Sequence, residues 1–531
     1  MQVARDRGAG IAIIGASGGG KSTLALLLYF WESESGTQCM VLDPKNDFEK
    51  FTYYIAFGEQ VMQPGFSADA EAGILGTEES QFQPVNPEFW AETTIVSLAR
   101  GAAGQLDAWS LTDSYAEADE LARGQVEVLF TDKDDRTIVE QALAVMKEAY
   151  DAEQAGEPIH GDPIVPSMGT VVRFLEQSRE KYRPMAEDAD NANAFNATEK
   201  LEQLDRVINR FKRARDTRYA KLLVGNGQRV DLGDMTRRRV IFTLHGFAPP
   251  KKPDQPETWS ESERNAAAAM FTVLDLVQKL FDDRPKPNPV TGEMKTPPRA
   301  LFVDEGYMIA RQPTGQGILS RGLRQGRSLN LVIVFISQQP RDVREIEQQA
   351  KDAGEADSNQ FGTIFMFRQK SPVEAARALE LLRDTSGGTT TETVALARKL
   401  LEEGKSAGGQ LRGGRCVMRD VDNRVATVSV DQMFAELARA TETNPNDRPR
   451  AQSIPISGSG RDWEIDPTTM LEVRTGISEA NMRGDYTDDL ELDEDWHDFI
   501  ARNIDELEAA NAAAAVTAER LYTESGLEDA H

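Results

Sequence analysis

The chain has 531 residues, which is long for one small module and sufficient for several domains. Hydrophobic residues make up 40% and charged residues 28%, a composition that excludes a fibrous or wholly disordered protein. The formal net charge of -27 argues against bulk electrostatic attraction to nucleic acid or to an anionic membrane surface, although a local basic patch stays open. Two cysteines and four histidines argue against a disulfide framework or a cysteine-based zinc site, and they predict a reducing, cytoplasmic compartment.

The sequence shows neither a membrane-spanning segment nor a secretory signal. Its longest apolar stretch, residues 24–31, falls well short of the ~20 apolar residues that a membrane helix needs. The first apolar run, residues 11–14, leads into a glycine-rich turn rather than a cleavage site. Because the first functional motif begins so close to Met1, we expect that the chain lacks an upstream domain.

Short apolar runs bounded by glycine, proline or charged residues recur along the chain and are typical of buried strands in a mostly parallel sheet. Amphipathic helical segments, such as residues 262–281, lie between them. This alternation predicts an α/β fold with a doubly wound sheet. The strand-like runs are residues 11–14, 40–42, 240–244, 300–303, 331–336, 364–367 and 425–430.

Two changes along the sequence, one in the hydrophobic pattern and one in the charge, predict the domain organisation. Between residues 101 and 235 the strand-like runs nearly vanish, and the amphipathic segments 136–150, 171–182 and 198–221 predict an all-helical insertion. Residues 442–531 carry more than half of the net negative charge and predict an acidic, partly disordered tail, in which the spacing around Trp496 suggests one amphipathic helix. The predicted domains are a first core part at 1–100, the insertion at 101–235, a second core part at 236–440 and the tail at 441–531.

Residues 15–23 match the pattern GxxxxGK[ST] directly after a strand-like run and before a helix, which is the context that a P-loop requires. Lys21 is predicted to neutralise phosphate oxygens, and the Ser22 hydroxyl to coordinate Mg²⁺. The alternative is a glycine-rich turn that binds no nucleotide. The predicted nucleotide-binding residues are Gly15, Ser17, Gly18, Gly19, Gly20, Lys21, Ser22 and Thr23.

The run 300–303 ends in Asp304 and Glu305, at the end of a strand where open α/β sheets bind their ligands. Downstream of a P-loop this is typical of a Walker B motif, in which Asp304 holds Mg²⁺ through water and Glu305 is the general base. Taken alone, a strand that ends in two carboxylates is more often a solvated turn.

A third strand-like run, residues 331–336, leads to Gln338, whose amide is suited to contact a γ-phosphate or to position water. The alternative is a plain turn before Pro340. Upstream, Arg321, Arg324 and Arg327 are spaced by three residues on a helical turn and are either solvated or directed at a neighbouring subunit's γ-phosphate. A separate basic run at residues 206–221 is either a nucleic-acid or acidic-partner surface or a solvated face that answers nearby carboxylates.

The order of these motifs resembles the ATPase domain of the type IV secretion and conjugation ATPases of the VirB-four or TraC class, within the HerA–FtsK superfamily of ring motors. The resemblance covers roughly residues 8–435. It is carried, in chain order, by the P-loop at 15–23, the segment 41–48 with Asp43-Pro44, Asn86-Pro87, Asp304-Glu305, and Gly326-Arg327 leading to Ser337-Gln338. It implies a RecA-like P-loop NTPase fold, ATP and Mg²⁺ as cofactors, a homo-hexameric ring, and Arg327 as the arginine that faces the next subunit. The acidic tail, and the lack of a domain before the P-loop, depart from the family pattern.

From these features we predict a Mg²⁺-dependent ATP hydrolase that forms a ring and powers a type IV secretion or conjugation machine. Its expected partners are copies of itself and components of that apparatus, which would place it in the cytoplasm or at the inner face of the membrane. One rival is a DNA-translocating motor of the HerA, FtsK or coupling-protein class, which needs a basic pore. A rival of another class is a nucleotide-gated scaffold without appreciable turnover, for which a positioned Glu305 has no use.

Overall fold

The fold was obtained as a computed structural model, and it describes most of the chain between residues 10 and 440. The predicted acidic tail lies outside the described residues. Those described are 10–430 and 440, with gaps at 64–65, 67–81, 99–100, 157–162, 189–192, 216, 218, 229, 231, 246–249, 251–254, 283–296, 311–312, 353–359, 370 and 384–414.

The core is one nine-stranded sheet with the order β3-β4-β2-β5-β6-β1-β7-β8-β9. Neighbours from β3 to β7 pair in parallel, whereas β8 and β9 extend the sheet as an antiparallel pair. This confirms the predicted α/β class with a mostly parallel sheet. The strands are β1 (Gly10–Ile14), β2 (Gln38–Asp43), β3 (Thr93–Ser97), β4 (Arg239–Thr243), β5 (Arg299–Val303), β6 (Leu331–Ser337), β7 (Phe361–Met366), β8 (Arg415–Arg419) and β9 (Val425–Ser429).

Helices cover both faces of the sheet because the central strands are apolar on both sides. Ile11 and Ile13 of β1 face the cluster that contains α2, whereas Ala12 and Ile14 face the opposite cluster. The helices are α2 (Lys21–Glu34), α3 (Asp47–Phe57), η1 (Gly58–Met62), α4 (Pro87–Ala91), α5 (Ala108–Leu111), α6 (Tyr115–Leu129), α7 (Lys133–Gln154), α8 (Met168–Glu187), α9 (Ala194–Arg215), α10 (Ala220–Leu223), η2 (Pro256–Thr258), α11 (Glu261–Asp282), α12 (Tyr307–Ala310), α13 (Pro313–Leu329), α14 (Pro340–Asp352) and α15 (Pro372–Arg383).

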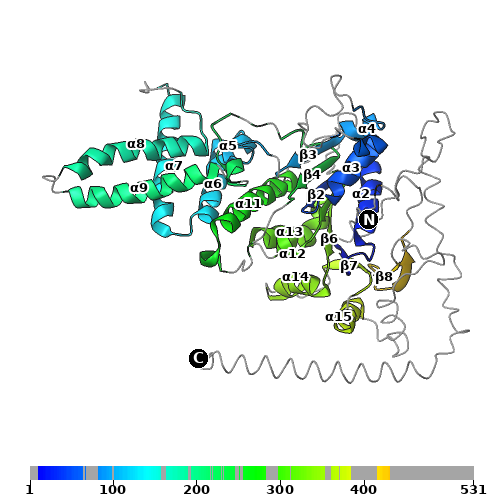
Figure 1. The fold of residues 1–531 in the computed structure, drawn as a ribbon. Helices are drawn as coiled ribbons and strands as arrows, with labels where there is room; N and C mark the ends of the chain where they lie inside the picture. Colours follow the sequence, from blue (N-terminus) through cyan, green and yellow to red (C-terminus); the bar gives the residue numbers. More distant parts are fainter. Residues whose placement is uncertain are drawn as a thin grey trace, which may run out of the picture. The chain divides into compact units, whose positions relative to one another are not determined.

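Between β3 and β4 every regular element in the described ranges is a helix, α5 to α10. Three of these helices are capped by the side chain of the residue just before them. Backbone N–H groups at the starts of α6, α7 and α8 donate to Ser114, Asp132 and Ser167 respectively. Figure 1 shows α8 and α9 side by side, and an ion pair between Arg179 and Asp205 joins them at 2.8 Å. The segment expected to be helical at 198–221 is interrupted after α9, and α10 forms a separate turn; the division of the chain into domains stays a prediction.

The parallel register brings several strand ends to one edge of the sheet. Ile14 of β1 pairs with Ser337 of β6, and Val303 of β5 lies between Leu42 of β2 and Phe335 of β6. Since the carboxyl ends of parallel strands lie at the same edge, the loops that follow β1, β2, β5 and β6 meet there.

Candidate active site

The P-loop is a backbone cradle between β1 and α2. Gly15, Gly18 and Gly20 have φ angles of 154°, 76° and 100°, which a residue with a Cβ adopts only at a cost. A Cβ on Gly15 would lie 2.6 Å from Cβ of Phe367, whereas a Cβ on Gly18 would meet nothing within 4 Å. The N-cap of α2 is Gly20, which offers no capping side chain, so the first N–H groups of the helix point toward the loop as they do in anion sites.

Lys21 is the first residue of α2 and is 7% exposed. Its ammonium group donates to the carbonyl oxygen of Ala16 at 3.0 Å, within the loop. Ser17, Ser22 and Thr23 are less buried than Lys21. The structure thus places a cation inside the cradle that the glycines form.

Asp304 and Glu305 follow β5 and are 4% and 5% exposed. Glu305 adopts a left-handed backbone conformation, φ 46°, and the N–H of Gly306 then donates to Ile336 at 2.8 Å. Burial raises the pKa of Asp304 to about 6 against the lowering effect of Lys45, and the neighbouring Glu305 adds to the rise. Within the described residues, Asp304 Oδ2 and Glu305 Oε2 are buried without a hydrogen-bond partner.

Gln338 connects the carboxylate pair to the P-loop. Its amide nitrogen donates to Glu305 Oε1 at 2.8 Å, and its amide oxygen accepts from the Ser17 hydroxyl at 3.4 Å. The side chains predicted from three separate motifs therefore lie in one cluster.

Two residues of this cluster were not assigned a role from the sequence. Lys45, in the loop after β2, forms an ion pair with Glu305 Oε1. Burial would lower the pKa of Lys45, but Asp304 and Glu305 outweigh it and raise the pKa. Asp47 begins α3, and burial raises its pKa against the opposing effects of Lys45, Lys50 and the Ser22 side chain. Both residues lie within the segment 41–48 that carries part of the family resemblance, which gave neither of them a role.

Asp43 fixes the loop that carries Lys45 and Asp47. It is fully buried at the end of β2, and its two carboxylate oxygens accept the N–H groups of Asp47 at 3.1 Å and Glu49 at 2.9 Å. Burial raises its pKa to about 8, and the charge of Asp304 contributes in the same direction.

Arg327 is not brought to this cluster within one chain. It is exposed on the last turn of α13, just before β6, whereas Gln338 follows the end of the same strand. At about 3.3 Å per residue, a strand of this length separates the two residues by roughly 20 Å. Arg324, which is also exposed, lies one turn earlier on α13. The role of Arg327 therefore stays a prediction about a neighbouring subunit.

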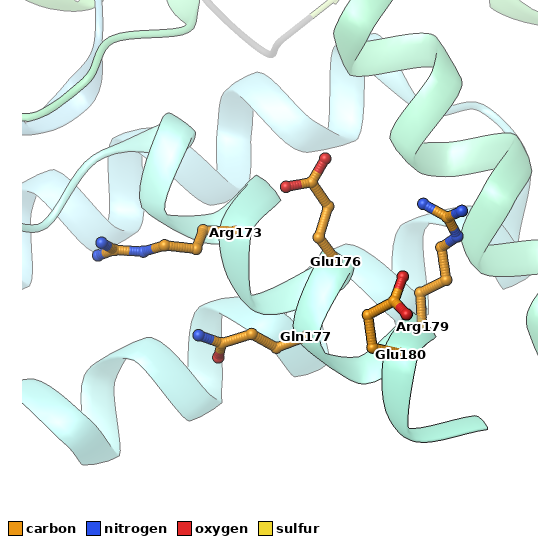
Figure 2. A pocket seen from close by; sticks show the side chains of 5 residues that line it. All are labelled: Arg173, Glu176, Gln177, Arg179 and Glu180. Atoms are coloured by element: carbon orange, nitrogen blue, oxygen red, sulfur yellow. The ribbon is translucent and has the colours of Figure 1, made fainter. Parts of the chain in front are cut away.

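The insertion carries a separate surface hollow of about 520 Å³, lined entirely by charged and polar side chains of α8. Figure 2 shows these residues, which are Arg173, Glu176, Gln177, Arg179 and Glu180. Lys212 of the basic run pairs with Glu176 at 2.9 Å, and Arg206 pairs with Asp135 at 2.7 Å. These contacts match the expectation of a solvated face that answers nearby carboxylates.

The residues of the cluster fit a bound nucleotide with Mg²⁺. The open space at Gly18 and the cation of Lys21 suit phosphate oxygens, and the unpaired Asp304 Oδ2 suits a metal-bound water. No group of three or more His, Cys, Asp or Glu side chains in the described part of the chain could hold a metal by itself. A Mg²⁺ ion held by Ser22 and Asp304 would therefore need phosphate oxygens of the nucleotide as further ligands.

Residues 2–441 match the family model of the AAA-like domain, so the chain belongs to this family. The uncharacterized protein YddE of Bacillus subtilis (strain 168) is 22% identical over 433 residues, which are 81% of this chain and 42% of YddE. The chain thus spans less than half the length of that relative. None of the helices in the described ranges is long and apolar enough to cross a membrane.

Similar solved structures include VirB4 of Thermoanaerobacter pseudethanolicus, with a TM-score of 0.46 and 14% identity, covering 81% of this chain and 90% of that one. The bacterial conjugative coupling protein TrwBdeltaN70 has a TM-score of 0.41 and 12% identity, covering 80% and 86%. The plasmid coupling protein TrwB in complex with ADP and Mg²⁺ has a TM-score of 0.40 and 13% identity, with the same coverage of 80% and 86%. The predicted resemblance is confirmed at the level of family and fold.

Proposed function

We propose that this chain is a Mg²⁺-dependent ATPase that works in a hexameric ring and powers a type IV secretion or conjugative transfer machine. The ATPase assignment rests on one observation: Lys21, the buried pair Asp304-Glu305 and Gln338 meet at one edge of the sheet. The assignment to secretion is supported by the order of the motifs and by membership of the AAA-like domain family. The same proposal places the chain in the cytoplasm or at the inner face of the membrane, held there by apparatus components.

Different residues of the chain would bind the phosphates, hold the metal and accept the proton. Lys21 and the N–H groups at the start of α2 would bind the β- and γ-phosphates. Ser22 and Asp304 would hold Mg²⁺, which when bound neutralises charge on the phosphate oxygens. Glu305 would take a proton from the attacking water at Oε2 while the water oxygen bonds to the γ-phosphorus and the bond from that phosphorus to ADP breaks.

Two observations favour this function over its rivals. A DNA-translocating motor needs basic side chains that face the nucleic acid, and Arg206 and Lys212 of the most basic helix instead pair with carboxylates of the insertion. A scaffold that only binds nucleotide has no use for Glu305, which is buried and keeps Oε2 without a partner in the described structure.

Phosphate release from ATP by the purified chain tests the proposal. We expect turnover in the presence of Mg²⁺, its loss when EDTA removes the metal, and less than about twofold stimulation by single- or double-stranded DNA. Stimulation of 10-fold or more by DNA would support the translocase instead. Tight ATP binding with no phosphate release would support the scaffold.

A further inference from the structure

Lys45 contacts the predicted general base directly, although the sequence motifs assign it no role. We infer that Lys45 is a positioning residue that anchors Glu305 through Oε1 and so reserves Oε2 for the attacking water. This inference rests on the proposed ATPase function and deepens it.

The turn that carries Lys45 is held rigidly. The ring of Pro44 fixes the φ angle of the residue before Lys45, and Asn46 follows in the left-handed conformation with φ 63°. The buried carboxylate of Asp43 then accepts the N–H groups of Asp47 and Glu49 at the start of α3. The backbone that carries the Lys45 side chain is thus fixed, although the side chain itself is 39% exposed.

The backbone of Glu305 is equally constrained. Its φ of 46° is a conformation that non-glycine residues rarely adopt, and it places the side chain at the end of β5. A Cβ on the next residue, Gly306, would lie 2.1 Å from the ring of Phe335, so the turn cannot shift toward β6. A long side chain on this turn still has three rotatable bonds, and only side-chain contacts can fix the position of its carboxylate.

The two carboxylate oxygens of Glu305 differ in their contacts. Oε1 accepts from Lys45 and from the amide nitrogen of Gln338, which come from the loops after β2 and β6. Oε2 is buried and has no partner among the described residues. A carboxylate whose one oxygen accepts from two donors cannot rotate freely. The other oxygen is then the one available to accept a proton from water.

Lys45 also offsets the charge around the base. The pKa of Lys45 is raised by the negative charges of Asp304, Glu305 and Asp47. Lys45 is the cation within this group of carboxylates that contacts Glu305. The alternative is that Lys45 binds a phosphate of the nucleotide and acts independently of Glu305. The two roles differ in how the substitutions combine.

A double-mutant cycle in turnover separates these roles, using Lys45→Met, Glu305→Gln and the double variant. We expect Lys45→Met to lower kcat by about 10-fold or more with KM within about twofold, because a positioned base contributes about 10²- to 10⁴-fold in total. In the Glu305→Gln background the same substitution should change kcat by less than about twofold. Lys45→Arg should restore part of the loss, and Lys50→Met, at an exposed lysine on α3, should behave like the wild type.

A second readout uses the nucleotide-free chain and needs no turnover. Lys45→Met should lower the melting temperature, because the carboxylates beside it lose their counter-charge. Glu305→Gln in the same chain should recover part of that loss, since it removes one of those carboxylates. A fall in melting temperature that is equal in both backgrounds would overturn the contact itself.

Three results in turnover would overturn the inference while leaving the ATPase function in place. They are wild-type kcat in Lys45→Met, equal losses with and without Glu305→Gln, and a raised KM at constant kcat. A wild-type chain that hydrolyses no ATP would instead overturn the proposed function, and the inference would fall with it.

Discussion

Lys21 is a charged residue in a place where charge is costly. It is 7% exposed, and the hydrogen-bond acceptor shown for its ammonium group is the carbonyl of Ala16 in its own loop. An ammonium group buried this far from solvent needs hydrogen-bond acceptors or an anion close to it. Under the proposed function, phosphate oxygens in the cradle would accept hydrogen bonds from this ammonium group, and nucleotide affinity would depend on it.

We therefore expect Lys21→Ala to bind nucleotide too weakly to measure under conditions that saturate the wild type. Titration with a fluorescent ATP analogue measures this affinity, with Lys50→Ala as the control at an exposed lysine. A charge-assisted hydrogen bond is worth about 1.5 to 3 kcal/mol, so at least about a 10-fold loss should follow from one contact alone. Unchanged affinity in Lys21→Ala would show that the cradle does not bind phosphate.

The site residues differ in how far the sequence could predict them. Lys21, Asp304 and Glu305 stand in local patterns whose geometry follows from a strand and the turn after it, so their place at the sheet edge was predictable. Lys45 has no such pattern, because its partner Glu305 follows a different strand far along the chain. Only the order of strands in the sheet brings β2 next to β5, and that order cannot be read from local periodicity.

At the scale of elements, Asp107 holds part of the insertion together. Its side chain is 1% exposed and accepts N–H groups from Trp109 at 3.2 Å and from Met168 and Gly225 at 2.8 Å each. These bonds join the start of α5 to the start of α8 and to the segment after α10. Burial raises the pKa of Asp107 to about 6, although the three N–H groups oppose the rise.

This raised pKa predicts a pH dependence of stability. Between about pH 4 and pH 6 the folded chain keeps the proton on Asp107 while the unfolded chain loses it, so stability falls as pH rises through that window. A rise of the pKa to about 6 corresponds to a loss of about 3 kcal/mol of stability, which is complete above about pH 6. Melting temperatures of the wild type and Asp107→Asn from pH 4 to pH 8 measure it, and the variant should show the shallower slope. Parallel curves for the two chains would contradict the assignment.

Among the elements, long amphipathic helices and apolar central strands were predictable, and two short strands were not. Thr93–Ser97 forms β3 at the edge of the sheet, where a polar, β-branched strand needs no continuous apolar run. Arg415–Arg419 forms β8 with an arginine at each end, and Arg419 is buried because it donates to the carbonyls of Leu381 and Phe361. Such tertiary contacts override the local preference of the residue.

At the scale of the whole molecule, the position of Arg327 bears on the proposed ring. Within one chain it lies beyond the amino end of β6, on the far side of the strand from Gln338. This separation follows from the strand predicted at residues 331–336, because an extended strand places its two ends far apart. If Arg327 acts on a γ-phosphate, it must do so in the site of a neighbouring copy.

We expect turnover per subunit to rise with protein concentration as rings assemble, and Arg327→Ala to abolish that rise without loss of ATP affinity. An arginine supplied across an interface is worth about 10³- to 10⁵-fold in other NTPases. Mixing Arg327→Ala with Lys21→Ala should restore some activity, because some interfaces then join an intact P-loop to an intact arginine. Concentration-independent turnover, with Arg327→Ala unimpaired, would contradict the ring model.

In the proposed function, Glu305 is the base of an ATP-hydrolysing site formed with the P-loop. The most direct test measures ATP affinity and single-turnover hydrolysis for the wild type and Glu305→Gln side by side. For Glu305→Gln we expect affinity within about threefold of the wild type and hydrolysis slower by about 10²- to 10⁴-fold, the usual contribution of a positioned base. Hydrolysis by Glu305→Gln at the wild-type rate would contradict it.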